Sequence, residues 1–196
     1  MIIEERRVTI DTYFAECAAL RDREGFTQLT DLTVIDYLTY GQSEWVTQQA
    51  TTHGFGRGKL ALDLQKGQKD RNRFEVVIHL LNYQENRRVK VRCFVPVEVM
   101  TMPSLFEIWA SANWYEREAF DLFGVAFDRH PDLRRLLTDY GFCGYPLRKD
   151  FPMMGYDQII YDRKTEVCVH EEVRDRLRVP VPKVIRFPSS PKKEQL

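Results

Sequence analysis

Residues 74–95, FEVVIHLLNYQENRRVKVRCFV, carry the pattern that decides the fold. In the two halves, Phe74–Tyr83 and Val89–Val95, an apolar residue recurs at every second position, and the polar residues Gln84–Arg87 between them favour a turn. Alternate residues of a strand point to opposite faces, so the two halves share one apolar face. That face consists of Phe74, Val76, Ile78, Leu80, Val89, Val91, Cys93 and Val95. We therefore expect a β-hairpin whose apolar face lies in the core.

The opposite face of the second strand is basic, because it carries Arg88, Lys90 and Arg92. Antiparallel sheets commonly keep one face in water. We therefore favour a solvated face, with coverage by an acidic partner as the alternative.

The sequence before the hairpin predicts a helix, a strand and a loop. Residues 11–24 place apolar groups at helical spacing behind Asp11, a possible cap, and Gly25 follows where a helix would stop. Residues 29–38 are rich in Thr, Val, Ile and Tyr, which is typical of a strand. Residues 40–72 contain five glycines and many polar groups, which indicates a loop.

The sequence after the hairpin changes to a period of 3.6 residues, which predicts helices. Ser104 and Glu107 have the spacing of a capping box, in which each side chain bonds the other residue's backbone, and Asn113 and Glu116 repeat that spacing. We therefore predict two successive helices.

The second of these helices should cover Trp114–Phe123 and end at Gly124, because glycine readily adopts the left-handed cap conformation. A short helix is also predicted for Pro131–Leu137, since proline suits the first helical position.

Composition bounds the classes of protein that the chain could be. Its 196 residues suit one domain, and 43% hydrophobic residues argue against general disorder. The 29 basic and 29 acidic residues balance, which argues against nucleic-acid and anionic-membrane binding. The longest stretch without a charged residue, Trp45–Gly56, is too short for a membrane span, and the charged N-terminus is unlike a targeting peptide.

The four cysteines, at positions 17, 93, 143 and 168, are widely spaced and form no C-x-x-C pair. Zinc and iron–sulfur sites need clustered ligands, so we expect no metal site in this chain. Small buried residues or surface thiols in a reducing compartment are the better interpretation.

The expected fold class is α+β: a two-layer domain over residues 1–152, with a mixed or antiparallel sheet covered by helices, and an extended C-terminal extension over residues 153–196. Residues 177–196 contain four prolines, five basic residues and one acid, a composition that favours extended chain. This tail is either disordered or a strap that becomes ordered on another subunit. The apolar residues available to such a strap are Val179, Val181, Val184, Ile185 and Phe187.

The segment 114–152 concentrates charge. Trp114, Arg117, Glu118 and Asp121 fall on one helix face, where Arg117 and Asp121 can pair. The apolar side of the same helix consists of Tyr115, Ala119, Leu122 and Phe123. Residues 116–150 contain seven acids and six bases, which favours a salt-bridged network over a groove for an anion.

A catalytic interpretation would use Glu118, Asp121 and His130 around a metal or a small acid, in a free-standing enzyme. A lone histidine is more often a structural hydrogen-bonding residue, so we disfavour the catalytic interpretation. The GxGxG at residues 54–58 lacks the third glycine of a dinucleotide-binding fingerprint.

Residues 116–137, EREAFDLFGVAFDRHPDLRRLL, resemble the signature of the NuoC family, the C subunits of the proton-pumping NADH:quinone oxidoreductase, respiratory complex I. The matching positions are Glu116, Arg117, Glu118, Asp121, Leu122, Phe123, His130 and Arg134. The resemblance continues through LTDYGF and PLRKDFP and covers most of residues 26–152, with one departure at Tyr145, where such sequences often have histidine.

The resemblance implies a non-catalytic subunit of the peripheral arm, on the cytoplasmic side of the bacterial inner membrane. Its partners would be complex I subunits D, B and I, with the C-terminal extension lying along the D subunit. FMN, iron–sulfur clusters and quinone would belong to partner subunits of the complex, which couples NADH oxidation and quinone reduction to proton translocation. An equivalent subunit of a related membrane-bound hydrogenase is the alternative.

We therefore expect the charged network to hold the domain surface against the D subunit while the tail clamps it. The network residues are Glu116, Arg117, Glu118, Asp121, His130, Arg134, Arg135, Arg148, Lys149 and Asp150.

Overall fold

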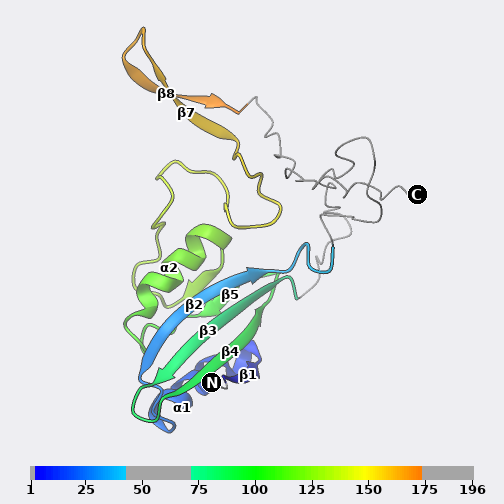
Figure 1. The fold of residues 1–196 in the computed structure, drawn as a ribbon, viewed down its shortest axis with the longest axis vertical. Coiled ribbons are helices and arrows are strands. Elements are labelled where there is room, and N and C mark those ends of the chain that lie inside the picture. The colour runs from blue at the N-terminus through cyan, green and yellow to red at the C-terminus, as the bar shows by residue number, and fades with distance from the viewer. Residues whose placement is uncertain (1–2, 43–71, 174–196) are drawn as a thin grey trace, which may run out of the picture.

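A computed structural model describes residues 3–42 and 72–173, and these contain a four-stranded sheet in the order β1-β4-β3-β2 (Figure 1). Strands β3 (Phe74–Asn82) and β4 (Arg87–Val95) form the predicted antiparallel hairpin, with Phe74 opposite Val95. Strand β2 (Gln28–Asp36), also predicted, pairs antiparallel with β3. Strand β1 (Glu4–Val8) pairs parallel with β4, so the sheet is mixed.

The sequence pattern does not predict strand β1, because EERRV has no apolar alternation. Its charges are matched across the sheet: Glu5 pairs with Lys90 at 2.6 Å and with Arg92 at 3.1 Å. Hydrogen bonds from Lys90 and Arg92 lower the pKa of Glu5 to about 2. Arg92 also donates to Glu75 at 2.6 Å. Two of the three basic residues on this face of β4, Lys90 and Arg92, are thus paired with acids of this chain.

Both helices pack on the other face of the sheet, which gives the predicted two-layer α+β fold (Figure 1). Helix α1 (Ile10–Asp22) begins after Thr9, not at a cap formed by Asp11, and buries Tyr13, Cys17 and Leu20. Helix α2 (Ala112–Phe123) ends at Gly124, whose φ of 73° is the predicted left-handed cap. The apolar face of the hairpin completes the core.

Two predicted helices are absent from the described residues. The chain after Pro96 instead forms a short strand, β5 (Thr101–Pro103), followed by turns, and β5 pairs parallel with β6 (Ala126–Asp128). Residues 131–137, predicted as helical, are turns and irregular chain. Asp121 of α2 accounts for the second correction, because it binds the amides of Leu136 and Leu137, which a helix over residues 131–137 would have used.

A second hairpin, β7 (Asp157–Asp162) and β8 (Val167–Glu172), forms a two-stranded sheet of its own, and Figure 1 shows it apart from the main sheet. It lies in the predicted extension 153–196, whose wrapping of a partner stays a prediction. The strap residues of the tail, the GxGxG glycines and most of the predicted loop 40–72 lie outside the described residues. No helix within the described ranges is long and apolar enough to cross a membrane.

Candidate functional site

Three charged residues of α2 are buried: Glu116 and Asp121 are fully buried, and Arg117 is 7% exposed. Of the predicted apolar side, Ala119 and Phe123 are buried, while Tyr115 and Leu122 pack at the edge of the core. Burying a charge is costly unless the group is paired or hydrogen-bonded. The partners of these three side chains therefore define the site.

Asp121 binds the irregular chain at residues 135–138. Its carboxylate accepts hydrogen bonds from the amides of Leu136, Leu137 and Thr138 at 3.0, 2.6 and 2.8 Å, and from the Thr138 hydroxyl, and it pairs with Arg135 at 3.0 Å. Burial acts to raise its pKa, but these hydrogen bonds outweigh burial and hold the pKa well below its usual range. Because the amides donate to Asp121, they are not available to the predicted helix 131–137.

Arg117 binds the same segment through carbonyl oxygens of its backbone. It donates to the carbonyl oxygens of Arg134 at 3.2 Å and Arg135 at 3.3 Å, and its guanidinium lies over the Trp114 ring at 5.2 Å. The expected pair between Arg117 and Asp121 does not form in the described structure, since each residue binds the following chain instead.

Glu116 binds the segment after β5. Its two carboxylate oxygens accept hydrogen bonds from the Ser104 hydroxyl and the Leu105 amide, both at 2.6 Å. Burial raises the pKa of Glu116 to about 7, against the opposing effect of these two bonds. Neither predicted capping box forms, because Ser104 and Glu116 bind each other's segments, and the actual N-cap of α2, Ser111, makes no side-chain cap bond.

His130 lies beside Glu116, with 4.0 Å between its Nε2 and the carboxylate. Its Nε2 bonds the Asn113 carbonyl oxygen at 3.2 Å, and its Nδ1 accepts from the Asp132 amide at 3.1 Å. Burial lowers the pKa of His130, so the neutral ring with a proton on Nε2 fits both contacts. With both nitrogens bonded to the backbone, His130 acts here as a structural hydrogen-bonding residue.

A second cluster ties the PLRKDFP segment to the end of β2. The Asp36 carboxylate accepts from two nitrogens of Arg73 at 3.0 Å and from the Lys149 amide at 2.9 Å, while Arg73 also pairs with Asp150 at 3.0 Å. Sequence reasoning includes Lys149 and Asp150 but misses Asp36 and Arg73. Asp36 continues the inward alternation of β2, and an acid at such a position is a signal that a cation faces it.

Arg148, Arg135 and Tyr145 join these clusters. Arg148 donates to the Phe123 carbonyl oxygen at 2.6 Å, at the end of α2, and its guanidinium lies 4.3 Å from the Tyr145 ring centre. Arg135 donates to the Gly144 carbonyl oxygen at 3.1 Å. Residues 134–150 are therefore fastened to α2 and β2 by charged groups.

Glu118 and Arg134, also predicted for the network, lie at its exposed edge. Arg134 pairs with exposed Asp132 at 2.8 Å. The proposed catalytic trio does not assemble, because Glu118 is exposed while Asp121 and His130 bind separate backbone segments. In the described part of the chain, no group of three or more His, Cys, Asp or Glu side chains is placed to hold a metal. All four cysteines are free, two buried and two exposed.

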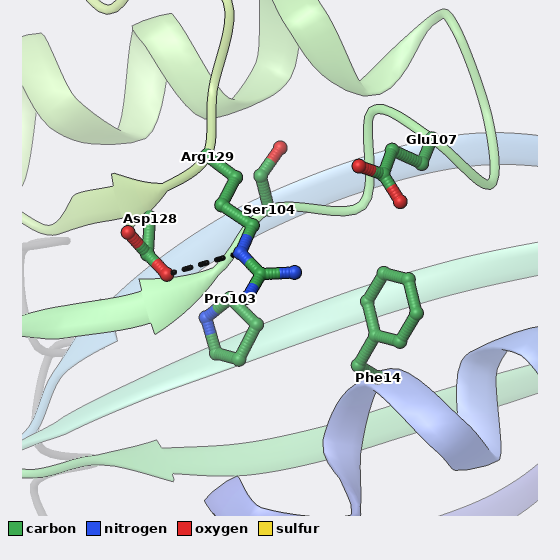
Figure 2. A pocket seen from close by; sticks show the side chains of 6 residues that line it. All are labelled: Phe14, Pro103, Ser104, Glu107, Asp128 and Arg129. Atoms are coloured by element: carbon green, nitrogen blue, oxygen red, sulfur yellow. Dashed lines mark ion pairs between the residues drawn. The ribbon is translucent and has the colours of Figure 1, made fainter.

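A pocket of about 300 Å³ lies beside this site, and Figure 2 shows the six side chains that line it: Phe14, Pro103, Ser104, Glu107, Asp128 and Arg129. Arg129 pairs weakly with Asp128, at 3.8 Å. Ser104 is already bonded to Glu116. The pocket thus borders the buried network without exposing its carboxylates.

The segments joined by this network fall within a known family. The family model described as "Respiratory-chain NADH dehydrogenase, 30 Kd subunit" matches residues 7–157. The chain belongs to this family. All ten network residues lie within the match, and membership makes the chain one subunit of an enzyme complex, NADH-quinone oxidoreductase or complex I.

Relatives of the 30 Kd subunit family match most of the chain. The C subunit of the NADH-quinone oxidoreductase of Legionella pneumophila (strain Corby) is 50% identical over 169 residues, covering 85% of this chain and 74% of the relative. The corresponding subunit of Xanthomonas euvesicatoria pv. vesicatoria (strain 85-10) is 47% identical over 193 residues, covering 89% and 77%.

Solved structures are also similar. A chain of the membrane-bound sulfane sulfur reductase, an archaeal respiratory membrane complex, aligns over 94% of this chain and 87% of its own, with a TM-score of 0.57 and 21% identity, which shows the fold alone. A trypsin-resistant fragment of Nqo5 aligns over 66% of this chain and 81% of its own, with a TM-score of 0.48 and 30% identity.

Proposed function

We propose that the chain is a non-catalytic scaffold in the peripheral arm of complex I, where it binds the D subunit and lies near the B and I subunits. The observation that carries this proposal is the use made of the charged residues of α2. Glu116, Arg117 and Asp121 bind this chain's own backbone and line no open cleft. A network of this kind holds a surface rigid, which is what a scaffold needs.

The second hairpin supports a docking role. Five of its apolar side chains are between 38% and 60% exposed: Ile159, Ile160, Tyr161, Val167 and Val169. An isolated two-stranded hairpin is marginally stable in water, and contiguous exposed apolar residues mark interaction sites. We assign this surface, together with the tail that follows it, to the D subunit.

In this proposal the chain itself carries no cofactor. FMN, the iron–sulfur clusters and quinone are held by partner subunits, and the whole complex couples electron transfer from NADH to quinone with proton translocation. The chain is peripheral, on the cytoplasmic side of the bacterial inner membrane.

The fold similarity to a chain of the archaeal membrane complex supports a second candidate, an equivalent subunit of a complex I-related membrane-bound complex such as a hydrogenase. The two candidates differ in their partners. Purifying the native complex and identifying its other chains decides between them, since only complex I contains the NADH-oxidising subunits.

The scaffold proposal is tested by removing residues 177–196 from a tagged chain in a strain that lacks the native copy. We expect the D subunit to be lost from the purified material while the isolated variant keeps its melting temperature. Retention of the D subunit would refute the clamp. Quinone reductase turnover or a bound metal in the isolated, purified chain would refute the non-catalytic assignment.

A further inference from the structure

A second pocket, of about 330 Å³, lies between residues 139–143 and the base of the β7–β8 hairpin. Phe142, Phe151 and Tyr156 form an aromatic wall, with ring centres 5.7 Å apart for the two phenylalanines and 5.3 Å apart for Phe151 and Tyr156. Its volume is at the small end of ligand sites, about 300–1,000 Å³. It would suit one side chain or a small molecule.

Acidic groups complete the pocket. Asp139 and Asp157 both line it and both are exposed. Asp139 accepts a hydrogen bond from the Tyr140 amide at 2.8 Å, which leaves further lone pairs on its carboxylate. Within residues 3–42 and 72–173, no lysine or arginine forms an ion pair with either carboxylate. The pocket therefore combines aromatic rings with two carboxylates that pair with no lysine or arginine of the described residues.

A pocket with aromatic rings and carboxylates favours the binding of a cation. The face of an aromatic ring is negative and attracts a guanidinium or ammonium group, and a carboxylate attracts it further. An arginine fits best, because its planar group stacks on a ring while its donors reach a carboxylate. The neighbouring loop already shows this chemistry: Arg135 lies 5.8 Å from the Phe142 ring centre and pairs with Asp121, so it is committed elsewhere.

We propose that this pocket receives an arginine side chain of a partner subunit. The inference rests on the proposed function, because it supposes that the chain docks into a larger complex through the hairpin. The pocket adjoins that surface, since Ile159 of β7 is one of its walls.

Cys143 provides a first test, because its exposed thiol also lines the pocket. In the free chain, iodoacetamide should modify Cys143 readily, as measured by mass spectrometry of the peptides. In the assembled complex, we expect modification to slow by at least about ten-fold. An equal rate in the complex would overturn the proposal.

The chain's own Arg174, Arg176 and Arg178 are the rival source of a cation, because they follow in sequence on Val173, whose amide bonds the Tyr156 carbonyl oxygen at 2.9 Å. The full-length variant with all three changed to Gln distinguishes the two. If Cys143 is protected in the free wild-type chain and becomes reactive in this variant, the partner assignment is wrong.

The second test measures binding of full-length variants to complex prepared without this subunit. We expect Asp139→Asn with Asp157→Asn to weaken binding by about ten-fold, and Tyr156→Leu similarly, from the usual strength of cation–π and ion-pair contacts. Asn at position 139 keeps the acceptor for the Tyr140 amide. Tyr156→Phe keeps the ring, and Glu16→Gln removes an exposed charge of α1, so both should bind within about two-fold of wild type.

The outcomes separate the two proposals. If the wild-type chain fails to bind the complex, the scaffold proposal fails. If it binds and the carboxylate and ring variants bind equally well, the arginine pocket alone is wrong.

Discussion

At the scale of single residues, the two buried carboxylates of α2 have pKa values shifted in opposite directions. Asp121 is surrounded by donors and is held ionised, whereas Glu116 has two donors and a pKa raised to about 7 by burial. Hydrogen-bond donors and the pair with Arg135 outweigh the effect of burial at Asp121, whereas burial outweighs the two donors at Glu116. Substituting each acid by its amide should accordingly have a different effect on stability.

Asp121→Asn should destabilise the isolated chain by roughly 2–4 kcal/mol, because it weakens the ion pair with Arg135 and leaves the part-buried amides of residues 136–138 poorly matched. Urea unfolding measures the effect. The matched control is Glu118→Gln on the exposed side of the same helix, expected within about 0.5 kcal/mol of wild type. Equal effects would show that the carboxylate does not hold the segment.

Glu116→Gln should change how stability depends on pH. Because the folded-state pKa of Glu116 is raised, its favourable contribution is complete below the unfolded value, near 4.5, and is lost as pH rises through about 7. The variant, which cannot ionise, should therefore gain on wild type by roughly 1–3 kcal/mol between pH 5 and pH 8. Melting temperatures across that range measure the gain. A difference that is constant with pH, whatever its size, would contradict this assignment.

At the scale of elements, α2 organises the chain around it. Its side chains hold the segment after β5 and residues 134–138, and its C-terminal glycine, Gly124, lets the side chains of Arg148 and Tyr145 approach the backbone closely. The short strands β5 and β6 before and after this helix pair with each other. The helix therefore contributes side chains both to the hydrophobic core and to the candidate site.

Gly124→Ala tests this close approach. A Cβ at Gly124 would lie 2.6 Å from Arg148 Nη2 and 2.6 Å from the Tyr145 ring, at a φ of 73° that disfavours alanine. We expect a loss of roughly 1–3 kcal/mol and faster proteolysis of residues 145–151. Gly141→Ala is the control, because no atom lies within 4 Å of its Cβ position, and it should be nearly neutral. Similar losses in both would exclude a specific role for Gly124.

At the scale of the whole molecule, the domain and the β7–β8 hairpin differ in how far their residues are buried. The domain has a core of buried apolar residues from the sheet and both helices, whereas every residue of β7 and β8 is at least partly exposed. The hairpin therefore contributes little to the stability of the isolated chain. On the scaffold proposal, its surface is completed in the complex.

Ile160→Thr with Val169→Thr separates stability from assembly, because threonine keeps the β-branch while removing apolar surface. These two residues are paired across the hairpin. The isolated variant should melt within about 2 °C of wild type, which corresponds to at most about 1 kcal/mol for a chain of this length. Its recovery with the other subunits should fall several-fold. Val99→Thr, an exposed site 67% accessible on the domain, is the control. Full recovery of the hairpin variant would refute this docking surface.

The sequence by itself determined the elements whose stability is local or periodic: helix α1, strands β2 to β4, and helix α2 with its glycine end. It also determined the family, because the charged segment 116–137 is specific. Apolar periodicity and a helix-ending glycine can be recognised from residues that are close together in the sequence. The charge-rich residues of the candidate site were therefore found, but not their partners.

Only the tertiary structure decided what those charges bind. Strand β1 pairs with β4 with Glu5 facing Lys90 and Arg92, and residues 131–137 are not helical because Asp121 binds the amides of Leu136 and Leu137. Each of these contacts joins residues far apart in sequence or turns a side chain toward backbone. The spacing of residues along the chain does not predict these contacts. A buried charge requires a partner, but that partner can lie anywhere in the sequence.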